Sequence, residues 1–564
     1  MKAQDNYNLW LNKSDLDYDL RQIMKKMSEE EKYDAFYCDL EFGTAGIRGI
    51  LGPGTNRMNK YTVRRASWAF GKYVLKYVKN ADKRGIVIAH DNRHYSREFC
   101  MEAAKVFLTL GIKAYVFDSL RPTPELSFAV RELNCAGGVV VTASHNPKEY
   151  NGYKVYDEHG CQLVPNLIDK LLEFYNSIHN VFDVKVDLTQ EDNIIVLDDS
   201  MDKKYYEAVD RIRLRRDLNT KDYKVVYTPE HGTGYQGVKY LLENQGYDLY
   251  LTEDQCEPNP DFANTLSPNP EEKGAYSKAI ELAKKVNADL VIATDPDADR
   301  LGVVELHDGE PVYFTGNQTG AMLVEYIINT RKELNSFKDN FVMFNTVVTS
   351  SLGAAIAKRN GVDVKSTLTG FKFIGEQINI LKTNDESKFL FGYEESYGCL
   401  ISSICRDKDA LQASTMICEM ACYYKEQGKT LLDVLNNIYE NYGYYYDKVK
   451  SISFSGEEGL KKIKAILQYF RKAKLTRLGD MTVDYLEDYL YSLKEGHNEK
   501  YLLTLPKSNV LRYLFNDGSF VAIRPSGTEP KCKFYFNVIG VSKEDAYQKG
   551  QSLEKFIDNL IKEI

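Results

Sequence analysis

The chain has 564 residues, of which 43% are hydrophobic and 27% charged, a composition typical of soluble globular proteins. Its length exceeds what one hydrophobic core can organise and predicts about three to four domains. The net charge of −8 argues against a nucleic-acid partner, because phosphate backbones select basic faces.

The sequence also predicts a cytoplasmic protein without a membrane partner. No apolar run approaches the roughly 18 residues of a membrane span, and the first residues are too polar for a signal peptide. The ten cysteines are scattered without a Cys-x-x-Cys pair. This pattern favours buried thiols in a reducing compartment over disulfides or metal ligands.

Short apolar strands alternate with amphipathic helices through most of the chain, which predicts parallel sheets covered by helices on both faces. In such sheets, ligands bind at the loops beyond the carboxyl ends of the strands. We expect strands at 85–90, 113–117, 138–142, 223–228, 288–293 and 341–347, and helices at 99–110, 237–244, 272–286 and after Ser350.

The last part of the chain has a different pattern, which predicts a small α+β domain. We expect strands or helices at 448–454, 461–471, 510–515, 520–524 and 531–539, and a final helix at 543–564. Boundaries near residues 200, 310 and 445 divide the chain into four domains, at 1–200, 201–310, 311–445 and 446–564.

A candidate nucleophile lies in the segment Thr142-Ala-Ser-His-Asn-Pro147, directly after an apolar strand. A serine on a tight turn at a strand end is exposed and positioned in advance, as a nucleophile or phosphate carrier must be. The same residue types also favour turns for structural reasons, so the motif alone leaves a simple turn open. Lys154 follows ten residues after Ser144 and is either a proton donor or acceptor for this loop or a solvated surface lysine.

A candidate metal site lies in Asp295-Pro-Asp-Ala-Asp-Arg300, where three carboxylates follow another apolar strand. In an extended loop, Asp295, Asp297 and Asp299 can converge on one hard cation, and Mg²⁺ prefers such oxygen ligands. An EF-hand is excluded, because its sixth position should be Gly but is Arg300 and its twelfth should be Glu but is Leu306. The segment therefore predicts a magnesium site.

Three further segments offer groups that bind phosphate or sugar hydroxyls. Arg524-Pro-Ser-Gly-Thr528 combines a guanidinium, two hydroxyls and a glycine, as in a phosphate cradle, although a polar turn would have similar residues. The three glycines of Gly43-Thr-Ala-Gly-Ile-Arg-Gly49 can bring Arg48 close to a phosphoryl group. In Gly392-Tyr-Glu-Glu-Ser396, Glu394 and Ser396 are suited to vicinal sugar hydroxyls.

The order and spacing of these five segments resemble the α-D-phosphohexomutase superfamily, the phosphoglucomutase and phosphomannomutase group. The resemblance runs from about Glu41 to Phe536. Within the superfamily, the chain is similar to the branch of bacterial phosphoglucomutases and phosphopentomutase-like enzymes. It departs from the family's DGDGDR form, because Pro296 and Ala298 stand where that form has glycine. The carboxylates are kept, so the expected metal site is kept, but the flexibility of the loop is in question.

The resemblance implies three α/β domains of similar fold with mixed sheets, a smaller C-terminal α+β domain, and a central cleft that receives one loop from each domain. It implies that Ser144 carries the phosphate and that one Mg²⁺ is held by Ser144, Asp295, Asp297 and Asp299. Arg48 and Lys154 match positions near the transferring phosphoryl group, and we count His145 with them as catalytic. The substrate-binding residues expected on this basis are Thr369, Gly370, Lys372, Glu394, Ser396, Lys408, Arg524, Ser526, Gly527, Thr528 and Arg300.

The implied activity is a reversible conversion of glucose 1-phosphate to glucose 6-phosphate through a phosphoserine enzyme and glucose 1,6-bisphosphate. The sequence leaves open phosphomannomutase, phosphopentomutase or glucose 1,6-bisphosphate synthase activity on the same scaffold. Two other classes remain as alternatives, a phosphoserine hydrolase and a non-catalytic sugar-phosphate-binding protein. The expected partner is a small sugar phosphate, and the protein is expected to be a monomer or a dimer.

Overall fold

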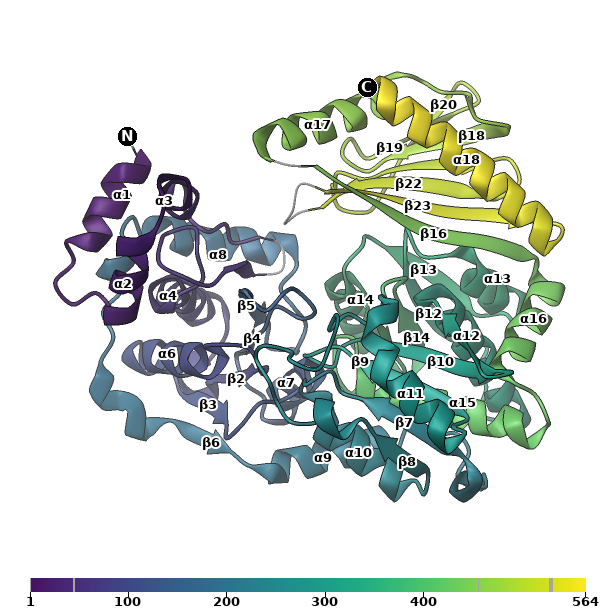
Figure 1. Cartoon of the computed structure of the whole chain (residues 1–564), viewed down its shortest axis with the longest axis horizontal. Helices are drawn as coiled ribbons and strands as arrows, with labels where there is room; N and C mark the ends of the chain where they lie inside the picture. The colour runs from purple at the N-terminus through teal and green to yellow at the C-terminus, as the bar shows by residue number, and fades with distance from the viewer. Residues whose placement is uncertain (1, 44–45, 455, 527–530) are drawn as a thin grey trace. The chain divides into compact units, whose positions relative to one another are not determined.

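The computed structural model of the chain describes residues 2–43, 46–454, 456–526 and 531–564 (Figure 1). The chain forms two compact units, which are described separately. The first unit contains Met1–Thr315 and Phe371–Gln427, and the second contains Gly316–Gly370 and Gly428–Ile564.

Three short helices precede the first sheet, in a region where the sequence analysis predicted no element. The indole of Trp10 is fully buried and lies with its ring centroid 5.8 Å from Phe36, 5.4 Å from Tyr61 and 5.0 Å from Phe182. This aromatic cluster packs the N-terminal helices against the parts of the first unit that carry Tyr61 and Phe182. They are α1 (Lys2–Leu11), α2 (Tyr18–Lys26) and α3 (Glu29–Phe36).

The first sheet has six strands in the order β1-β5-β4-β2-β3-β6. Strands β4, β2, β3 and β6 are parallel, whereas β5 and β1 are antiparallel to their neighbours, so the sheet is mixed, as the resemblance implied. Strands β1, β5 and β6 were not predicted. The strands are β1 (Ile47–Ile50), β2 (Ile86–His90), β3 (Ala114–Phe117), β4 (Gly137–Val141), β5 (Tyr150–Tyr156) and β6 (Ile195–Leu197).

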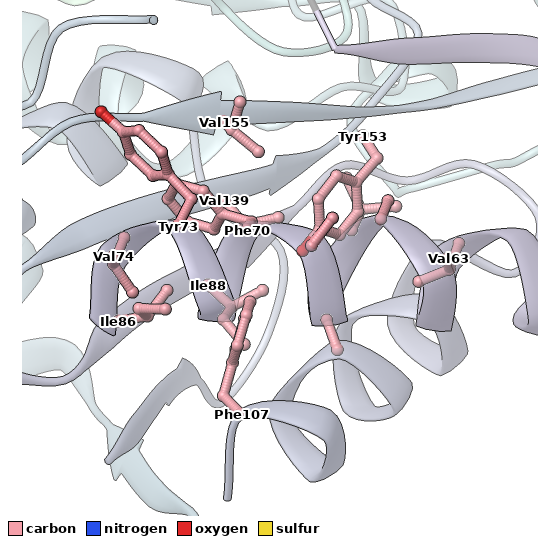
Figure 2. Close-up of a cluster of buried hydrophobic side chains, with 14 of the residues drawn as sticks. Val63, Phe70, Tyr73, Val74, Ile86, Ile88, Phe107, Val139, Tyr153 and Val155 are labelled. Atoms are coloured by element: carbon pink, nitrogen blue, oxygen red, sulfur yellow. The ribbon is translucent and has the colours of Figure 1, made fainter. Parts of the chain in front are cut away.

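Helices cover both faces of this sheet. Figure 2 shows side chains of α4, such as Phe70, packed against Ile88 of β2 and Val139 of β4, with Phe107 of α6 in the same core. On the other face α7 packs closely, since a Cβ on Gly138 would lie 2.6 Å from Val130 Cγ2. The helices are α4 (Lys60–Tyr77), α5 (Ala81–Arg84), α6 (Ser96–Thr109), α7 (Thr123–Glu132) and α8 (Pro165–Ser177).

The second sheet has five strands in the order β11-β10-β9-β7-β8. Its strands β9, β7 and β8 are parallel, and β10 and β11 add an antiparallel edge. The antiparallel step from β9 to β10 is made by the segment 295–300, which therefore lies at the carboxyl end of β9. The strands are β7 (Lys224–Thr228), β8 (Asp248–Leu251), β9 (Leu290–Thr294), β10 (Leu301–His307) and β11 (Glu310–Phe314).

Helix α11 covers one face of the second sheet, where small residues such as Ala279 and Ala283 let it approach the strands. Helix α15 contacts β9, β10, α9 and α10. The predicted helix 272–286 begins as the short 3₁₀ segment η5 (Lys273–Tyr276) before it continues as α11. The helices are α9 (Asp199–Asp210), α10 (Gly234–Asn244), α11 (Ser277–Val286) and α15 (Ala410–Glu426).

The region predicted as a third domain is shared between the two units. In the first unit, β14 (Phe389–Tyr393) pairs antiparallel with β15 (Cys399–Leu400) after α14 (Phe371–Asn384). In the second unit, β12 and β13 are parallel. The second unit's elements here are α12 (Gly316–Glu333), β12 (Val342–Thr346), α13 (Ser351–Arg359), β13 (Asp363–Thr367) and α16 (Leu431–Tyr442).

The C-terminal part of the second unit is an antiparallel sheet with helices α17 and α18 packed on one face (Figure 1). The strands and helices predicted for this part are present, but β17 to β20 were not predicted. The elements are β16 (Tyr444–Ser453), α17 (Gly456–Lys472), β17 (Arg477–Leu478), β18 (Met481–Asp488), β19 (Leu493–Gly496), β20 (Glu499–Leu502), β21 (Leu511–Phe515), β22 (Phe520–Pro525), β23 (Lys531–Gly540) and α18 (Lys543–Glu563).

The burial of the cysteines agrees with the sequence analysis. All ten cysteines are free, and all but Cys38 are buried. Among the helices of the described ranges, none combines the length and the apolar character that crossing a membrane requires.

Candidate active site

Ser144 lies in a tight turn immediately after β4, as the sequence predicted. Its φ of +53° is unusual for a residue with a side chain, and such backbone conformations require local support. The Ser144 N–H donates to Thr142 Oγ1 at 2.8 Å, and the Asn146 N–H donates to the carbonyl of Ala143 at 3.1 Å. These bonds hold the serine at the strand end in one orientation.

The segment that carries the three aspartates folds around Asp295. One carboxylate oxygen, Oδ1, accepts the backbone N–H groups of Asp299 and Arg300 at 3.1 and 3.0 Å. The other oxygen, Oδ2, therefore faces outward and accepts the hydroxyl of Ser144 at 2.8 Å. Two segments 151 residues apart in the sequence meet through this hydrogen bond.

The turn also shows which backbone conformation the loop adopts without the glycines of the DGDGDR form. Ala298 adopts the left-handed conformation, with a φ of +50°, and is fully buried. Alanine in this conformation costs roughly 1–2 kcal/mol. The loop therefore keeps the conformation that a glycine would adopt freely, and its surroundings stabilise it.

Three helix N-termini supply that stabilisation. The N–H of Thr233, which precedes α10, donates to the Pro296 carbonyl at 2.8 Å, and the N–H of Thr123, which begins α7, donates to the Asp297 carbonyl at 2.9 Å. The N–H of Ala410, which begins α15, donates to the carbonyl of Ala298 at 3.1 Å. Each bond satisfies one of the N–H groups that a helix start leaves free, and the positive ends of these helices favour an acidic loop.

The three carboxylates form a cluster that fits a hard cation. Oxygen atoms of Asp295, Asp297 and Asp299 lie within 4.8 Å of one another, and all three side chains are buried. Within the described ranges, Oδ1 of Asp297 and Oδ1 of Asp299 have no hydrogen-bond donor. Burial and the two neighbouring carboxylates raise the pKa of Asp295 well above its usual range. An all-oxygen set with buried, unsatisfied charge is what Mg²⁺ requires of a protein.

Two buried lysines neutralise part of this charge. Lys154 Nζ lies 2.8 Å from Asp297 Oδ2 and 3.7 Å from Asp299 Oδ2. Lys408 Nζ lies 2.9 Å from Asp299 Oδ2 and 3.2 Å from Asp407 Oδ1. Burial alone would lower the pKa of Lys154, but Asp297 and Asp299 outweigh it and raise that pKa. Lys154 is thus a protonated group at the carboxylate cluster and not a solvated surface lysine.

The imidazole of His145 lies beside the Ser144 hydroxyl. Its Nδ1 is 3.2 Å from Ser144 Oγ and 3.9 Å from Asp295 Oδ2. Burial lowers the pKa of His145 well below its usual range, and the guanidinium groups of Arg300 and Arg48 lower it further. The ring is therefore neutral at neutral pH. Its Nδ1 can accept a hydrogen bond from the hydroxyl or donate one to it, depending on the tautomer.

The two predicted arginines of the first unit occupy different places around the cluster. Arg48, on β1, donates to Asn146 Oδ1 at 3.0 Å and so contacts the loop of Ser144. Arg300 pairs with Glu271, and its Nε lies 3.7 Å from Asp299 Oδ1. Both guanidinium groups are thus held next to the proposed phosphate carrier or the carboxylates.

The predicted sugar-binding residues of the first unit are placed less tightly. Glu394 is buried, and Asp299, Asp407 and Glu394 together raise the pKa of Lys408 against the effect of burial. Ser396 is half-buried in the turn before β15, and Lys372 is buried on α14. Glu394 therefore helps, after Asp299 and Asp407, to favour the protonated form of Lys408.

The remaining predicted residues belong to the second unit or lie outside the described residues. Arg524 is half-buried near the end of β22, and the Ser526 N–H donates to the Lys531 carbonyl at 2.7 Å. Thr369 and Gly370 are the last residues of the segment Gly316–Gly370. Gly527 and Thr528 lie outside the described residues, so their assignment stays a prediction.

Gly232 gives a test of how the aspartate loop is supported. A Cβ at this position would lie 2.5 Å from Pro296 Cα and 2.6 Å from the Pro296 carbonyl oxygen, so Gly232→Ala must displace the loop. We expect it to weaken Mg²⁺ binding by about 10-fold or more, as loss of groups that orient metal ligands does. Calorimetric titration with Mg²⁺ measures this change. Gly274→Ala is the matched control, because its Cβ would meet only the exposed Leu266, and an equal loss in both variants would contradict the expectation.

Glu230, in the loop between β7 and α10, gives a pH test of stability. Its carboxyl accepts the hydroxyls of Thr228 and Thr265, and burial raises its pKa from 4.5 to about 8. As pH rises from 4.5 to 8, the unfolded chain loses this proton while the folded chain keeps it. The contribution of Glu230 to the free energy of unfolding therefore falls by about 1.4 kcal/mol per pH unit in this window.

The variant Glu230→Gln keeps the shape of the group and cannot ionise. We expect its stability advantage over the wild type to widen by about 2–4 kcal/mol between pH 5 and pH 8. Denaturant unfolding at several pH values measures the difference. Glu243→Gln, at an exposed position on α10, should give no widening, and a constant difference for Glu230→Gln would contradict the assigned pKa.

Four consecutive ranges of the chain match the domains of one protein family in order. Residues 39–181, 203–309 and 315–442 match the domains described as phosphoglucomutase/phosphomannomutase, alpha/beta/alpha domains I, II and III, and residues 461–547 match the C-terminal domain of the same family. The chain belongs to the phosphoglucomutase/phosphomannomutase family.

The chain is similar both to proteins of known sequence and name and to solved structures. A curated protein named phosphoglucomutase, from Staphylococcus aureus (strain bovine RF122 / ET3-1), is 38% identical over 553 residues, which cover 96% of this chain and 97% of the relative. The solved structure of Paramecium pp63/parafusin in its open form has a TM-score of 0.67 at 19% identity and covers 93% of this chain and 95% of its own. An Aspergillus fumigatus N-acetylphosphoglucosamine mutase, solved with GlcNAc-6P and magnesium, has a TM-score of 0.51 at 13% identity, over 93% and 96% of the two chains.

Family membership confirms the predicted fold class, with three α/β domains of similar fold and a smaller C-terminal domain. It also confirms that the protein is an enzyme of the mutase class, which is a class of isomerases. The sequence analysis missed residues that support the site, namely Thr123, Thr233, Asn146, Asp407 and Glu271. Asn146 lies within the motif of Ser144 and Asp407 is adjacent to Lys408. No local pattern marks Thr123, Thr233 and Glu271, because each acts on a segment that is distant in the sequence.

Proposed function

We propose that this mutase interconverts glucose 1-phosphate and glucose 6-phosphate, with glucose 1,6-bisphosphate as intermediate and activator. The observation that carries the proposal is the hydrogen bond from the Ser144 hydroxyl to Asp295 within the buried carboxylate trio. A hydroxyl at a site for a divalent cation is fitted to carry a phosphoryl group. The name and the near-complete coverage of the Staphylococcus relative support glucose as the sugar.

In the proposed cycle, phosphorylated Ser144 gives its phosphoryl group to the free hydroxyl of the sugar monophosphate. The bond between phosphorus and Ser144 Oγ breaks, a bond to the sugar oxygen forms, and the hydroxyl proton leaves to a nearby base. The bisphosphate then turns end over end, and Ser144 Oγ loses its proton and forms a bond to the other phosphorus. The bond between that phosphorus and the sugar oxygen breaks, and the sugar oxygen takes up a proton. The protonated Lys154 is placed to hold a proton at the transfer site, and His145 is placed to accept or return the proton of the Ser144 hydroxyl.

We assign the metal to Asp295, Asp297 and Asp299 together with an oxygen of Ser144. Bound there, Mg²⁺ would neutralise the charge of the transferring phosphoryl group, which is the main requirement of this chemistry. The chain's own residues supply the remaining charge control. Arg48 contacts the loop of Ser144, and Lys154 and Lys408 pair with the carboxylates.

The substrate contacts are proposed on the family pattern. Glu394, Ser396, Lys372, Lys408 and Arg300 would bind the sugar and orient it. Thr369, Gly370, Arg524, Ser526, Gly527 and Thr528 would hold the second half of the substrate, with the last four clamping the phosphate that does not react. We further propose that the four domains span residues 1–200, 201–310, 311–445 and 446–564. We propose that the protein is located in the cytoplasm and is a monomer or a dimer.

Turnover of glucose, mannose, ribose and deoxyribose 1-phosphates, measured with Mg²⁺ and trace glucose 1,6-bisphosphate, tests this function. We expect the highest kcat/KM for glucose 1-phosphate and one added phosphate on the intact protein by mass spectrometry. A preference for another sugar would reassign the substrate within the family. Steady release of inorganic phosphate without isomerised sugar would instead support a hydrolase.

A further inference from the structure

Arg93, which follows β2 by three residues, makes an unusual set of contacts with the loop of Ser144. One terminal nitrogen donates to the carbonyl of Ser144 at 2.6 Å and also to the carbonyl of Asn146. The other donates to the carbonyls of Pro147 and Tyr150 at 2.8 and 3.0 Å. One buried guanidinium thus gathers four backbone carbonyls of the segment 144–150.

Arg93 is itself held firmly. Its Nε lies 3.3 Å from Asp91 Oδ2, and both side chains are completely buried. The other oxygen of Asp91 accepts the Arg93 N–H at 2.9 Å and the Ser96 hydroxyl at 2.7 Å. The ring of Phe262 covers the guanidinium, with its centroid 5.2 Å away. Such a fixed, planar fork of donors is specific to arginine, because lysine carries a single ammonium point charge.

The contacts explain how the Ser144 backbone keeps its conformation. Carbonyl oxygens that converge on one point repel each other unless a cation lies between them, and Ser144 has the unfavourable φ of +53°. The carbonyl of Ser144 belongs to the same residue whose hydroxyl faces Asp295. Fixing that carbonyl therefore restrains the backbone from which the hydroxyl projects toward Asp295.

We infer that Arg93 is a positioning residue for phosphoryl transfer, which aims Ser144 Oγ at the carboxylate trio by holding the carbonyls of its loop. This inference rests on the proposed function, since it assigns Ser144 as the phosphate carrier. Arg93 acts through the backbone of Ser144, because its guanidinium is buried against Asp91, Phe262 and the loop carbonyls.

The test compares Arg93→Lys and Arg93→Met with the wild type in steady-state turnover of glucose 1-phosphate. A displacement of about 1 Å in a reacting group lowers rates by about 10²-fold, so we expect kcat to fall by about that factor in Arg93→Met. Arg93→Lys keeps the charge without the fork and should lose about 10-fold in kcat. In both variants KM for the sugar phosphate should stay within about twofold, because no substrate contact changes.

Arg84→Met is the matched control. Arg84 also donates to backbone carbonyls, those of Asn134 and Cys135, but at the start of β4, whereas Arg93 acts beyond its end. Its kcat should match that of the wild type. Asp91→Asn keeps Arg93 but removes the carboxylate charge that pairs with it, so it should lower kcat by about 3- to 10-fold. This variant tests the inference if Arg93→Met does not fold.

A second readout does not depend on activity. Hydrogen exchange of the peptide 142–151 should be faster in Arg93→Lys and Asp91→Asn than in the wild type and unchanged in Arg84→Met. The inference is overturned if the wild type is active and these two variants keep its kcat per folded molecule, or if KM rises while kcat is unchanged. An inactive wild type with the expected exchange pattern would overturn the proposed function and leave Arg93 as the residue that fixes the loop.

Discussion

Replacing Ser144 with alanine should lower turnover by at least about 10⁴-fold, because no other group can carry the phosphoryl group at that place. The fold should persist. The side chain contributes one buried hydrogen bond to Asp295, whose loss costs about 1 kcal/mol. Steady-state turnover, thermal unfolding and intact-mass analysis after incubation with glucose 1,6-bisphosphate measure the three consequences.

Ser67→Ala provides the comparison for this experiment. Ser67 is also buried in the first domain and shares a hydrogen bond of 2.8 Å with the hydroxyl of Tyr153. Its loss should cost a similar amount of stability and leave turnover and phosphorylation unchanged. If Ser144→Ala still gained a phosphate from the bisphosphate and turned over, another residue would be the carrier.

Replacing Asp295 with asparagine should separate metal binding from folding. Asparagine has the same shape, so its oxygen can still accept the N–H groups of Asp299 and Arg300 while its amide donates to Ser144 Oγ. The metal-free variant should therefore be at least as stable as the metal-free wild type at neutral pH, since one of three crowded carboxylates is removed. Its affinity for Mg²⁺ should fall by about 100-fold or more, and turnover by about 10³-fold.

Thermal unfolding with and without Mg²⁺ measures this separation. A ligand present at 100 times its Kd stabilises the folded state by about 2.7 kcal/mol, so Mg²⁺ should raise the unfolding temperature of the wild type clearly. With 100-fold weaker affinity the same Mg²⁺ concentration stabilises by only about 0.4 kcal/mol, so the shift should nearly disappear in Asp295→Asn. It should remain in Asp254→Asn, a surface variant of the same domain whose carboxylate pairs with Lys278. An unchanged shift in Asp295→Asn would place the metal elsewhere.

The parts of the site that the sequence predicted are those whose chemistry is local. Ser144 and Asp295 both follow apolar strands, and β4 and β9 both end within one residue of the predicted strand ends. The carboxyl ends of parallel strands carry the functional loops of such sheets, so strand prediction was enough to place these two residues. The alternation of strands and helices was also enough to predict α/β domains.

Other parts depended on strand direction, which local patterns do not encode. The alternation of strands and helices predicted parallel sheets and the family resemblance implied mixed ones, but neither predicted β5 as a strand. The antiparallel pairing of β5 with β4 sets Lys154 opposite Val140 and so brings it back to the end of the sheet where Ser144 lies. The same reversal from β9 to β10 creates the turn that gathers the three aspartates.

The order of amino acids alone identifies the chemical groups of this mutase: a hydroxyl, three carboxylates and several cations on named loops. Which of these groups meet depends on how the chain folds, because the contacts join residues far apart in the chain. Lys154 pairs with Asp297 across 143 residues, and Arg93 reaches the carbonyl of Ser144 across 51. Hydrogen bonds and ion pairs require distances near 3 Å, and such distances are set by the packing of whole helices and sheets, not by the identity of neighbouring residues.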